Sequence, residues 1–127
     1  MGDNTLPARR VLVVDDNRDA ANSVAALLRL CGQTVQQAYD GYAALRIASH
    51  FKPEVVFIDL VMPGMDGFAL ARQLRELEAT RNARLVALTA FGQPAFRDAA
   101  TESGMDAHLC KPASASELTS TIAMFGS

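Results

Sequence analysis

Cysteine, lysine and long apolar runs are all scarce in this chain of 127 residues. The two cysteines, Cys31 and Cys110, lack the spacing of a metal site, and we expect both to remain reduced. No apolar stretch approaches the roughly 20 residues that span a bilayer, and residues 1–8 lack the apolar run of a signal peptide. A net charge of −2 favours neither nucleic-acid binding nor membrane insertion. We therefore expect a cytoplasmic protein.

The pattern of apolar residues alternates between strand and helix five times. The predicted strands are residues 10–14, 34–38, 54–58, 84–89 and 107–110, and the predicted helices are 17–31, 41–50, 66–78, 94–103 and 114–125. This alternation predicts the α/β class, with a doubly wound five-stranded parallel sheet, (βα)5, covered by helices on both faces. Half of the chain is apolar, which is enough for the core of one domain. We expect residues 1–9 to form a disordered tail and residues 10–127 to form that domain.

Two of the predicted strands run directly into acidic residues. Asp15 and Asp16 follow the apolar run 11–14, and Asp59 follows the apolar run 55–58. Ligands of open α/β sheets bind at the carboxyl ends of the strands, so these three carboxylates are expected to meet there. Clustered carboxylates repel one another unless a hard cation lies among them, and Mg²⁺ prefers oxygen ligands. The sequence therefore predicts a magnesium site at this edge.

Two further strands end in groups that stabilise phosphate. The strand at 84–89 ends in Thr89 before Ala90, and the strand at 107–110 is followed by Lys111 and Pro112. A carboxylate nucleophile, a divalent metal, a hydroxyl and an ammonium together suit phosphoryl transfer to an aspartate. The transferring group is rich in electrons and needs cations and donors around its oxygens.

These features resemble the receiver domain of two-component response regulators, over nearly the whole chain from Arg10 to Phe125. The matching segments are 11–17, 58–67, 87–90 and 111–112. The separations also match the family: 43 residues from Asp16 to Asp59, 30 from Asp59 to Thr89, and 22 from Thr89 to Lys111. The resemblance implies a flavodoxin-like fold with strand order 2-1-3-4-5.

The resemblance also implies roles for the acidic residues. Asp59 would be the phosphoacceptor and a metal ligand. Asp16 would bind Mg²⁺ directly, Asp15 would bind it directly or through water, and the backbone carbonyl of Val61 would complete the protein ligands. Mn²⁺ would be able to substitute for Mg²⁺. The donor would be a phosphohistidine on a histidine kinase or a histidine phosphotransfer protein.

The remaining roles concern the phosphoryl oxygens and the response to phosphorylation. The hydroxyl of Thr89 and the backbone amide of Ala90 would hold one oxygen, and Lys111 would hold another. The Lys111–Pro112 peptide would be cis. Thr89 and His108 would form the switch, although the family usually has tyrosine or phenylalanine where this chain has the smaller, titratable His108.

Two apolar positions depart from the family pattern near the phosphoacceptor. Val61 lies two residues after Asp59, and Phe91 lies two residues after Thr89. Neither side chain can align a water molecule, and Phe91 could shield the phosphate, so slow loss of the phosphoryl group is expected. The segment 106–112 resembles receivers attached to hybrid sensor kinases.

We therefore expect a signalling module rather than a conventional enzyme, one that catalyses only its own Mg²⁺-dependent phosphorylation and dephosphorylation. Its 127 residues include no output domain, so it would act by protein contact with a downstream partner that the sequence does not identify. A phosphatase of the haloacid dehalogenase type would need an acid in place of Val61. A flavodoxin-like nucleotide or flavin binder would need a phosphate-cradling first loop in place of residues 15–17.

Overall fold

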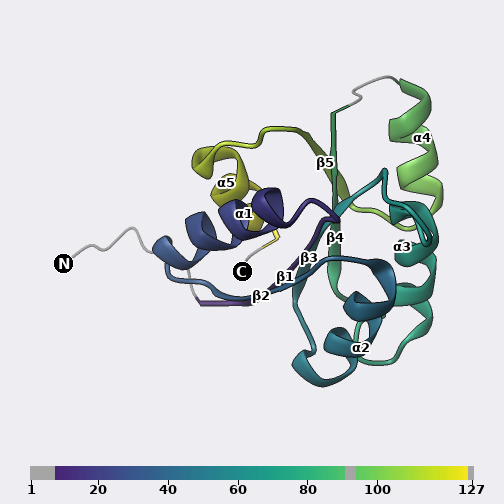
Figure 1. Cartoon of the computed structure of the whole chain (residues 1–127), viewed down its shortest axis with the longest axis horizontal. Helices are drawn as coiled ribbons and strands as arrows, with labels where there is room; N and C mark the ends of the chain where they lie inside the picture. Colours follow the sequence, from purple (N-terminus) through teal and green to yellow (C-terminus); the bar gives the residue numbers. More distant parts are fainter. Residues whose placement is uncertain (1–7, 91–93, 126–127) are drawn as a thin grey trace.

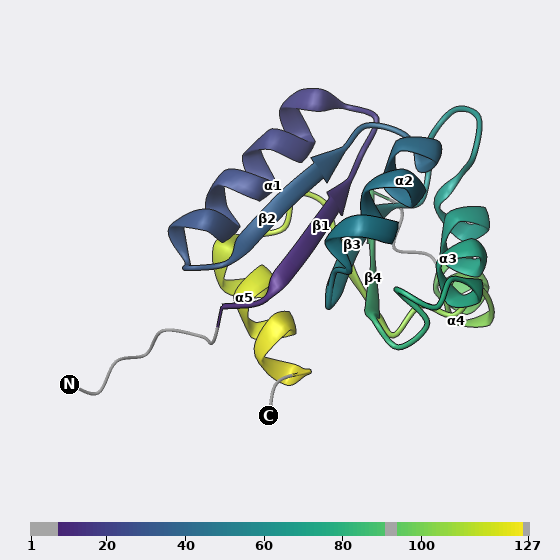
Figure 2. The same ribbon diagram turned by 90° about the horizontal axis from the view of Figure 1, so that it is seen from below.

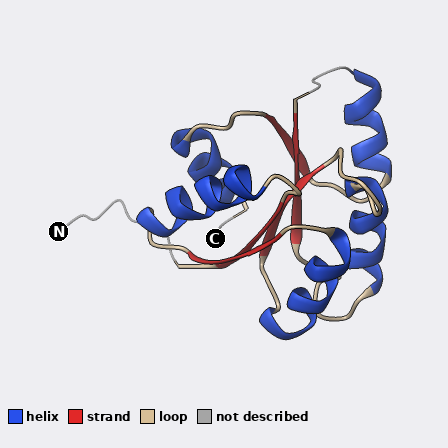
Figure 3. Cartoon of the chain, viewed as in Figure 1, coloured by secondary structure: helices blue, strands red, loops and turns tan. Residues whose placement is uncertain are grey.

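Strands and helices alternate along the part of the chain that the computed structural model describes, residues 8–90 and 94–125 (Figure 1, Figure 3). The strands are β1 (Arg10–Val14), β2 (Thr34–Ala38), β3 (Val55–Asp59), β4 (Arg84–Thr89) and β5 (Ala107–Cys110). The helices are α1 (Arg18–Leu30), α2 (Gly41–Phe51), α3 (Gly67–Glu76), α4 (Pro94–Glu102) and α5 (Ala115–Met124).

The strands form one parallel sheet in the order β2-β1-β3-β4-β5, which confirms the predicted fold. All four neighbouring pairs are parallel. The register places the ends of neighbouring strands level with one another, with Val14 opposite Ile58 and Asp59 opposite Leu88. Residues that follow β1, β3, β4 and β5 therefore emerge along one edge of the sheet.

Helices cover both faces of the sheet (Figure 1, Figure 2). One face packs against α1 and α5 through residues such as Val13, Phe57, Leu28 and Ile122. The other face packs against α2, α3 and α4, and Ile58 and Leu70 are among its fully buried side chains. Because alternate residues of a strand point to opposite faces, the unbroken apolar runs of β1 and β3 supply both cores.

Short polar side chains fix where the helices begin. Asn17, Asp40, Asp66 and Ser114 each accept a hydrogen bond from a backbone N–H in the first turn of α1, α2, α3 and α5, respectively. These N-caps satisfy donors that the helix itself leaves without partners. Asp40 and Asp66 each stand directly before a glycine that begins the helix, Gly41 and Gly67. All four caps open helices at the edge of the sheet where the strands end.

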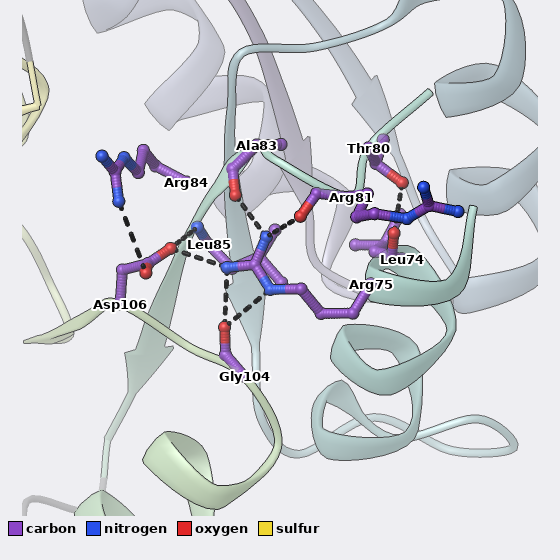
Figure 4. A network of polar contacts seen from close by, with 9 residues as sticks. All are labelled: Leu74, Arg75, Thr80, Arg81, Ala83, Arg84, Leu85, Gly104 and Asp106. Carbon is purple, nitrogen blue, oxygen red and sulfur yellow. Dashed lines mark hydrogen bonds and ion pairs between the residues drawn. The ribbon is translucent and has the colours of Figure 1, made fainter. Parts of the chain in front are cut away.

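Helix α3 ends at Glu76, two residues before the predicted end at residue 78. Leu77 has an extended backbone, and the hydroxyl of Thr80 donates to the carbonyl of Leu74 in the last turn of the helix (Figure 4). Arg75, in the same turn, makes a set of long-range contacts. Its guanidinium donates to the carbonyls of Gly104, Arg81 and Ala83 and to the carboxylate of Asp106. These bonds hold the segment after α3 and the turn before β5 against the amino-terminal edge of the sheet.

The two ends of the chain are described in part. Residues 1–7 of the expected tail and residues 126–127 lie outside the described residues. The N–H of Arg9 donates to the side-chain oxygen of Gln33, and its carbonyl accepts from the N–H of Thr34. Hydrogen bonding to the sheet thus begins one residue before β1. Within the described ranges, no helix has the length and apolar character needed to cross a bilayer.

Candidate functional site

Three carboxylates meet at the carboxyl edge of the sheet, as the sequence predicts. Asp15 and Asp16 follow β1, and Asp59 is the last residue of β3. One oxygen from each residue lies within 4.8 Å of the others, which is a spacing that a single metal ion can bridge. Asp15 and Asp59 are buried, whereas Asp16 is exposed.

Backbone amides orient the two buried carboxylates. Asp15 accepts from the N–H of Asn17 at 3.0 Å, and Asp59 accepts from the N–H of Val61 at 3.2 Å. Each bond joins a residue to the one two positions later, so the chain turns sharply just after the strand. In both residues the other carboxylate oxygen faces Lys111.

Lys111 brings a positive charge to these acids. Its ammonium lies 2.7 Å from Asp15 and 3.5 Å from Asp59. Its backbone N–H donates to the carbonyl of Thr89 at 2.8 Å, so β5 continues its pairing with β4 beyond Cys110. The Lys111–Pro112 peptide is cis, which confirms that expectation.

Burial and charge change the acidity of these groups. Burial raises the pKa of the Asp59 carboxyl from 3.8 to about 6, and the negative charge of Asp15 adds to the increase, while Lys111 and the Val61 N–H oppose it. The pKa of Lys111 is also raised. Burial acts to lower it, but the hydrogen bond to Asp15 and the charges of Asp59 and Asp15 outweigh that effect. Lys111 therefore remains charged at neutral pH.

The other predicted residues lie around the same edge. Thr89 ends β4 and is buried, and Ala90 follows it at the surface. Val61 is 54% exposed beside Asp59. Their assigned roles toward metal or phosphate stay predictions. Phe91 lies outside the described residues.

His108 lies in β5, opposite Ala87 of β4, and is partly buried. Its neighbours Ala107 and Leu109 pack on the face of α1 and α5. By strand alternation, His108 is on the opposite face, which carries α4. Its role in the switch stays a prediction.

Gly67 lies where α3 approaches the end of β3 most closely, a role that sequence patterns do not reveal. A Cβ atom at this position would lie 2.5 Å from the carbonyl oxygen of Asp59 and 2.8 Å from Cα of Leu60. The N–H of Gly67 donates to the carbonyl of Leu60 at 3.1 Å. Only glycine allows α3 to begin this close to the end of β3. The Asp66–Gly67 pair indicates a turn but does not reveal which strand end the turn approaches.

Comparisons with known proteins show the family to which the chain belongs. A family model described as the response regulator receiver domain matches residues 11–123. The transcriptional regulator RpaA of Synechocystis is 33% identical over 113 residues, which are 89% of this chain and 47% of that protein. The response regulator PleD of Caulobacter vibrioides is 37% identical over 103 residues, 81% of this chain and 23% of that protein. The chain thus spans less than half the length of these two relatives.

Solved structures show the same fold. Chemotaxis protein CheY4 of Vibrio cholerae has a TM-score of 0.89 and 27% identity, covering 93% of this chain and 98% of its own. The receiver domain of sensor histidine kinase PA1611 from Pseudomonas aeruginosa, solved with magnesium in its active-site cleft, has a TM-score of 0.84 and 29% identity. It covers 93% of this chain and 97% of its own.

Fold, sequence and site agree on one class of protein, a non-enzymatic signalling module that accepts a phosphoryl group. The chain belongs to the receiver domain family of response regulators. Receivers of this family work in two-component systems and take their phosphoryl groups from histidine kinases. The phosphatase and the flavin or nucleotide binder are thereby set aside as alternatives.

Proposed function

We propose that Asp59 is the phosphoacceptor. A carboxylate oxygen of Asp59 attacks the phosphorus of a donor phosphohistidine, and the phosphorus–nitrogen bond of the donor breaks. The imidazole of the donor keeps the bonding electron pair and takes up a proton. The supporting observation is that Asp59 ends the central strand β3 with one oxygen held by Val61 and the other facing Lys111. Asp15 already pairs with Lys111 at the shorter distance of 2.7 Å.

We propose that Asp15, Asp16, Asp59 and the carbonyl of Val61 hold Mg²⁺, for which Mn²⁺ can substitute. The donor set fits this ion because all the ligands are oxygens and three of them can converge within 4.8 Å. Lys111 alone leaves an excess of negative charge among these carboxylates. The metal would supply positive charge to the phosphoryl oxygens.

Thr89, the amide of Ala90 and Lys111 are proposed to bind the phosphoryl oxygens. The backbone N–H of Lys111 donates a hydrogen bond to the carbonyl of Thr89. A shift of the carboxyl end of β4 would therefore displace both residues. His108, in the same strand as the residues before Lys111, is proposed to respond to that movement together with Thr89. The domain would thus catalyse its own phosphorylation and dephosphorylation without being a conventional enzyme.

The proposed partners are a histidine kinase or a histidine phosphotransfer protein, and a downstream protein that the geometry does not identify. An apolar cavity of about 520 Å³ adjoins Lys111 and offers a contact surface for the donor. Val24 and Leu27 of α1 form one wall, and Pro112 and Ala113 form the other. The proposal includes a cytoplasmic location and a domain spanning residues 10–127, which either acts as a stand-alone regulator or is the receiver of a hybrid kinase.

The test is labelling with acetyl phosphate and Mg²⁺, followed by mass spectrometry of the intact protein. We expect one added phosphoryl group that hydroxylamine removes. Asp59→Asn should abolish it, and Asp16→Ala should abolish both labelling and the Mg²⁺-dependent rise in thermal stability. Asp66→Asn is the matched control, because it removes an exposed carboxylate yet keeps a good N-cap, and it should label normally. Full labelling of Asp59→Asn would show that the phosphoacceptor is another residue.

A further inference from the structure

Positive charge gathers at the opposite edge of the sheet from the phosphoryl site. A cavity of about 670 Å³ opens there, beside the start of β1 and the end of α5, which meet on one side of the molecule (Figure 2). Its charged lining residues are Arg9, Arg10, Lys52, Arg84, Glu54 and Glu78. The cavity therefore has an excess of two positive charges, although the whole chain carries −2.

Helix ends explain only part of this charge. Cations collect at the carboxyl ends of helices because the helix dipole is negative there. Arg10 serves this purpose, since its Nε donates to the carbonyls of Phe51 and Lys52 at the end of α2. Arg10 also pairs with Glu54 at 3.6 Å. The positive charge of Arg10 is therefore already balanced by partners within the protein.

Lys52 also stands at the carboxyl end of α2, whereas Arg9 lies just before β1 and at no helix end. Within the described part of the chain, neither forms an ion pair, and Nε of Arg9 is buried without a hydrogen-bond partner. A buried polar donor without an acceptor is unfavourable, and a ligand that supplies the acceptor would relieve it. Arg84 is also incompletely neutralised, since it lies 3.8 Å from Asp106 (Figure 4) and covers the ring of Phe125.

The backbone of Lys52 is also unusual. Lys52 ends α2 with φ of 52°, a left-handed conformation that glycine adopts without strain and that lysine rarely adopts. It is the only residue other than glycine with positive φ among the described residues. A lysine at this position places a flexible cation on the wall of the cavity, which a glycine would not.

We propose that this cavity binds a small polyanion carrying two or more phosphate groups. Several cations around one cavity favour a ligand with several charges, and guanidinium groups match phosphate oxygens in geometry. The volume lies in the range of small-molecule sites. The site is separate from Asp59 and does not depend on the phosphoacceptor assignment.

The test is a titration of the 127-residue chain with inorganic pyrophosphate in EDTA, followed by amide NMR shifts. Shifts are expected at Arg10, Lys52 and Arg84 and not at Asp15 or Val61. Asp59→Asn should bind equally well, so failure of one proposal is distinguishable from failure of the other. The same titration is repeated with nucleoside triphosphates. An affinity equal to that of pyrophosphate would show that the site recognises the phosphates alone, and a higher affinity would show an added contact to the nucleoside. No shifts, or shifts centred on Asp15, would overturn the proposal.

Variants that remove a positive charge and a variant that removes a negative charge are expected to change pyrophosphate affinity in opposite directions. Lys52→Gly and Arg9→Gln should each weaken pyrophosphate binding about fivefold. Lys52→Gly should do so without loss of thermal stability, because it relieves the backbone conformation. Glu78→Gln should strengthen binding by a similar factor. Arg72→Gln makes the same change of charge on the exposed surface of α3 and should leave affinity unchanged. Pyrophosphate affinity that is the same in all four variants would refute the site, and equal affinity for citrate would refute its preference for phosphate.

Discussion

At the scale of single residues, Lys111 lies closer to Asp15 than to the proposed phosphoacceptor. The ammonium is 2.7 Å from Asp15 and 3.5 Å from Asp59. Asp15 is almost fully buried, and a buried carboxylate without a partner is strongly unfavourable. Lys111 therefore stabilises the fold before any phosphoryl group is present, in addition to its proposed role toward phosphate.

Val61 is expected to control how long the phosphoryl group persists. Its side chain is 54% exposed next to Asp59 and carries no polar group to align an attacking water. Val61→Asn should speed loss of the phosphoryl group about fivefold, the effect of one net hydrogen bond in the transition state. The measurement is the decay of labelled protein after the donor is removed, at constant Mg²⁺. Val61→Ala is the control, and if it decays as fast as Val61→Asn, bulk rather than polarity controls access of water.

At the scale of elements, the site depends on how closely α3 approaches the end of β3. The N-cap Asp66 starts the helix, and Gly67 lets its first turn contact the backbone of Asp59 and Leu60. The hydrogen bond from Gly67 to Leu60 fixes this approach. The position of the proposed nucleophile is thus set by helix packing as well as by the sheet.

Gly67→Ala should destabilise the domain by about 1–3 kcal/mol, the usual cost of overpacking. The new Cβ would lie 2.5 Å from the Asp59 carbonyl oxygen, so labelling of Asp59 should also slow. Urea unfolding and the rate of labelling by acetyl phosphate measure the two effects. Gly64→Ala is the matched control: it meets no atom within 4 Å but has φ of +78°, so it should cost about 1–2 kcal/mol and leave labelling unchanged. Equal labelling rates in the two variants would contradict the role given to Gly67.

At the scale of the whole molecule, one carboxyl group links global stability to pH. The pKa of Asp59 is about 6 in the folded protein and 3.8 is its ordinary value. Between these values the folded state binds more protons, so this stabilisation is complete below about pH 4 and is lost as pH rises through about 6. Without metal, the free energy of unfolding should fall by up to about 3 kcal/mol between about pH 4 and pH 7 from this group.

The measurement for Asp59 is urea unfolding in EDTA across this pH range. Asp59→Asn should flatten the dependence and raise stability at neutral pH, while Asp66→Asn should retain the dependence of the parent chain. Millimolar Mg²⁺ should restore stability at neutral pH by binding only the folded state. An unchanged pH dependence in Asp59→Asn would mean that another group carries it.

Much of the fold could be predicted from sequence because its causes are local. Apolar runs such as Val11–Val14 define buried strands, and acids at their ends define the edge where ligands bind. Contacts between distant segments could not be predicted in this way. The bonds of Arg75 join the last turn of α3 to the turn before β5, and the pairing of Lys111 with Asp15 joins segments far apart in the sequence. The left-handed Lys52 stands where local preference would place glycine.

The charges at the carboxyl edge also set an order of assembly. With Asp15, Asp16, Asp59 and Lys111 all ionised, the edge has two more negative than positive charges, and an arriving phosphohistidine is itself an anion. Coulomb repulsion opposes their encounter, and it weakens only at high ionic strength or when a counter-ion arrives. A divalent cation brings the edge to neutrality. For the proposed metal site, we therefore expect metal loading to precede productive docking of the donor, and we expect labelling by the donor to slow when free metal is scarce.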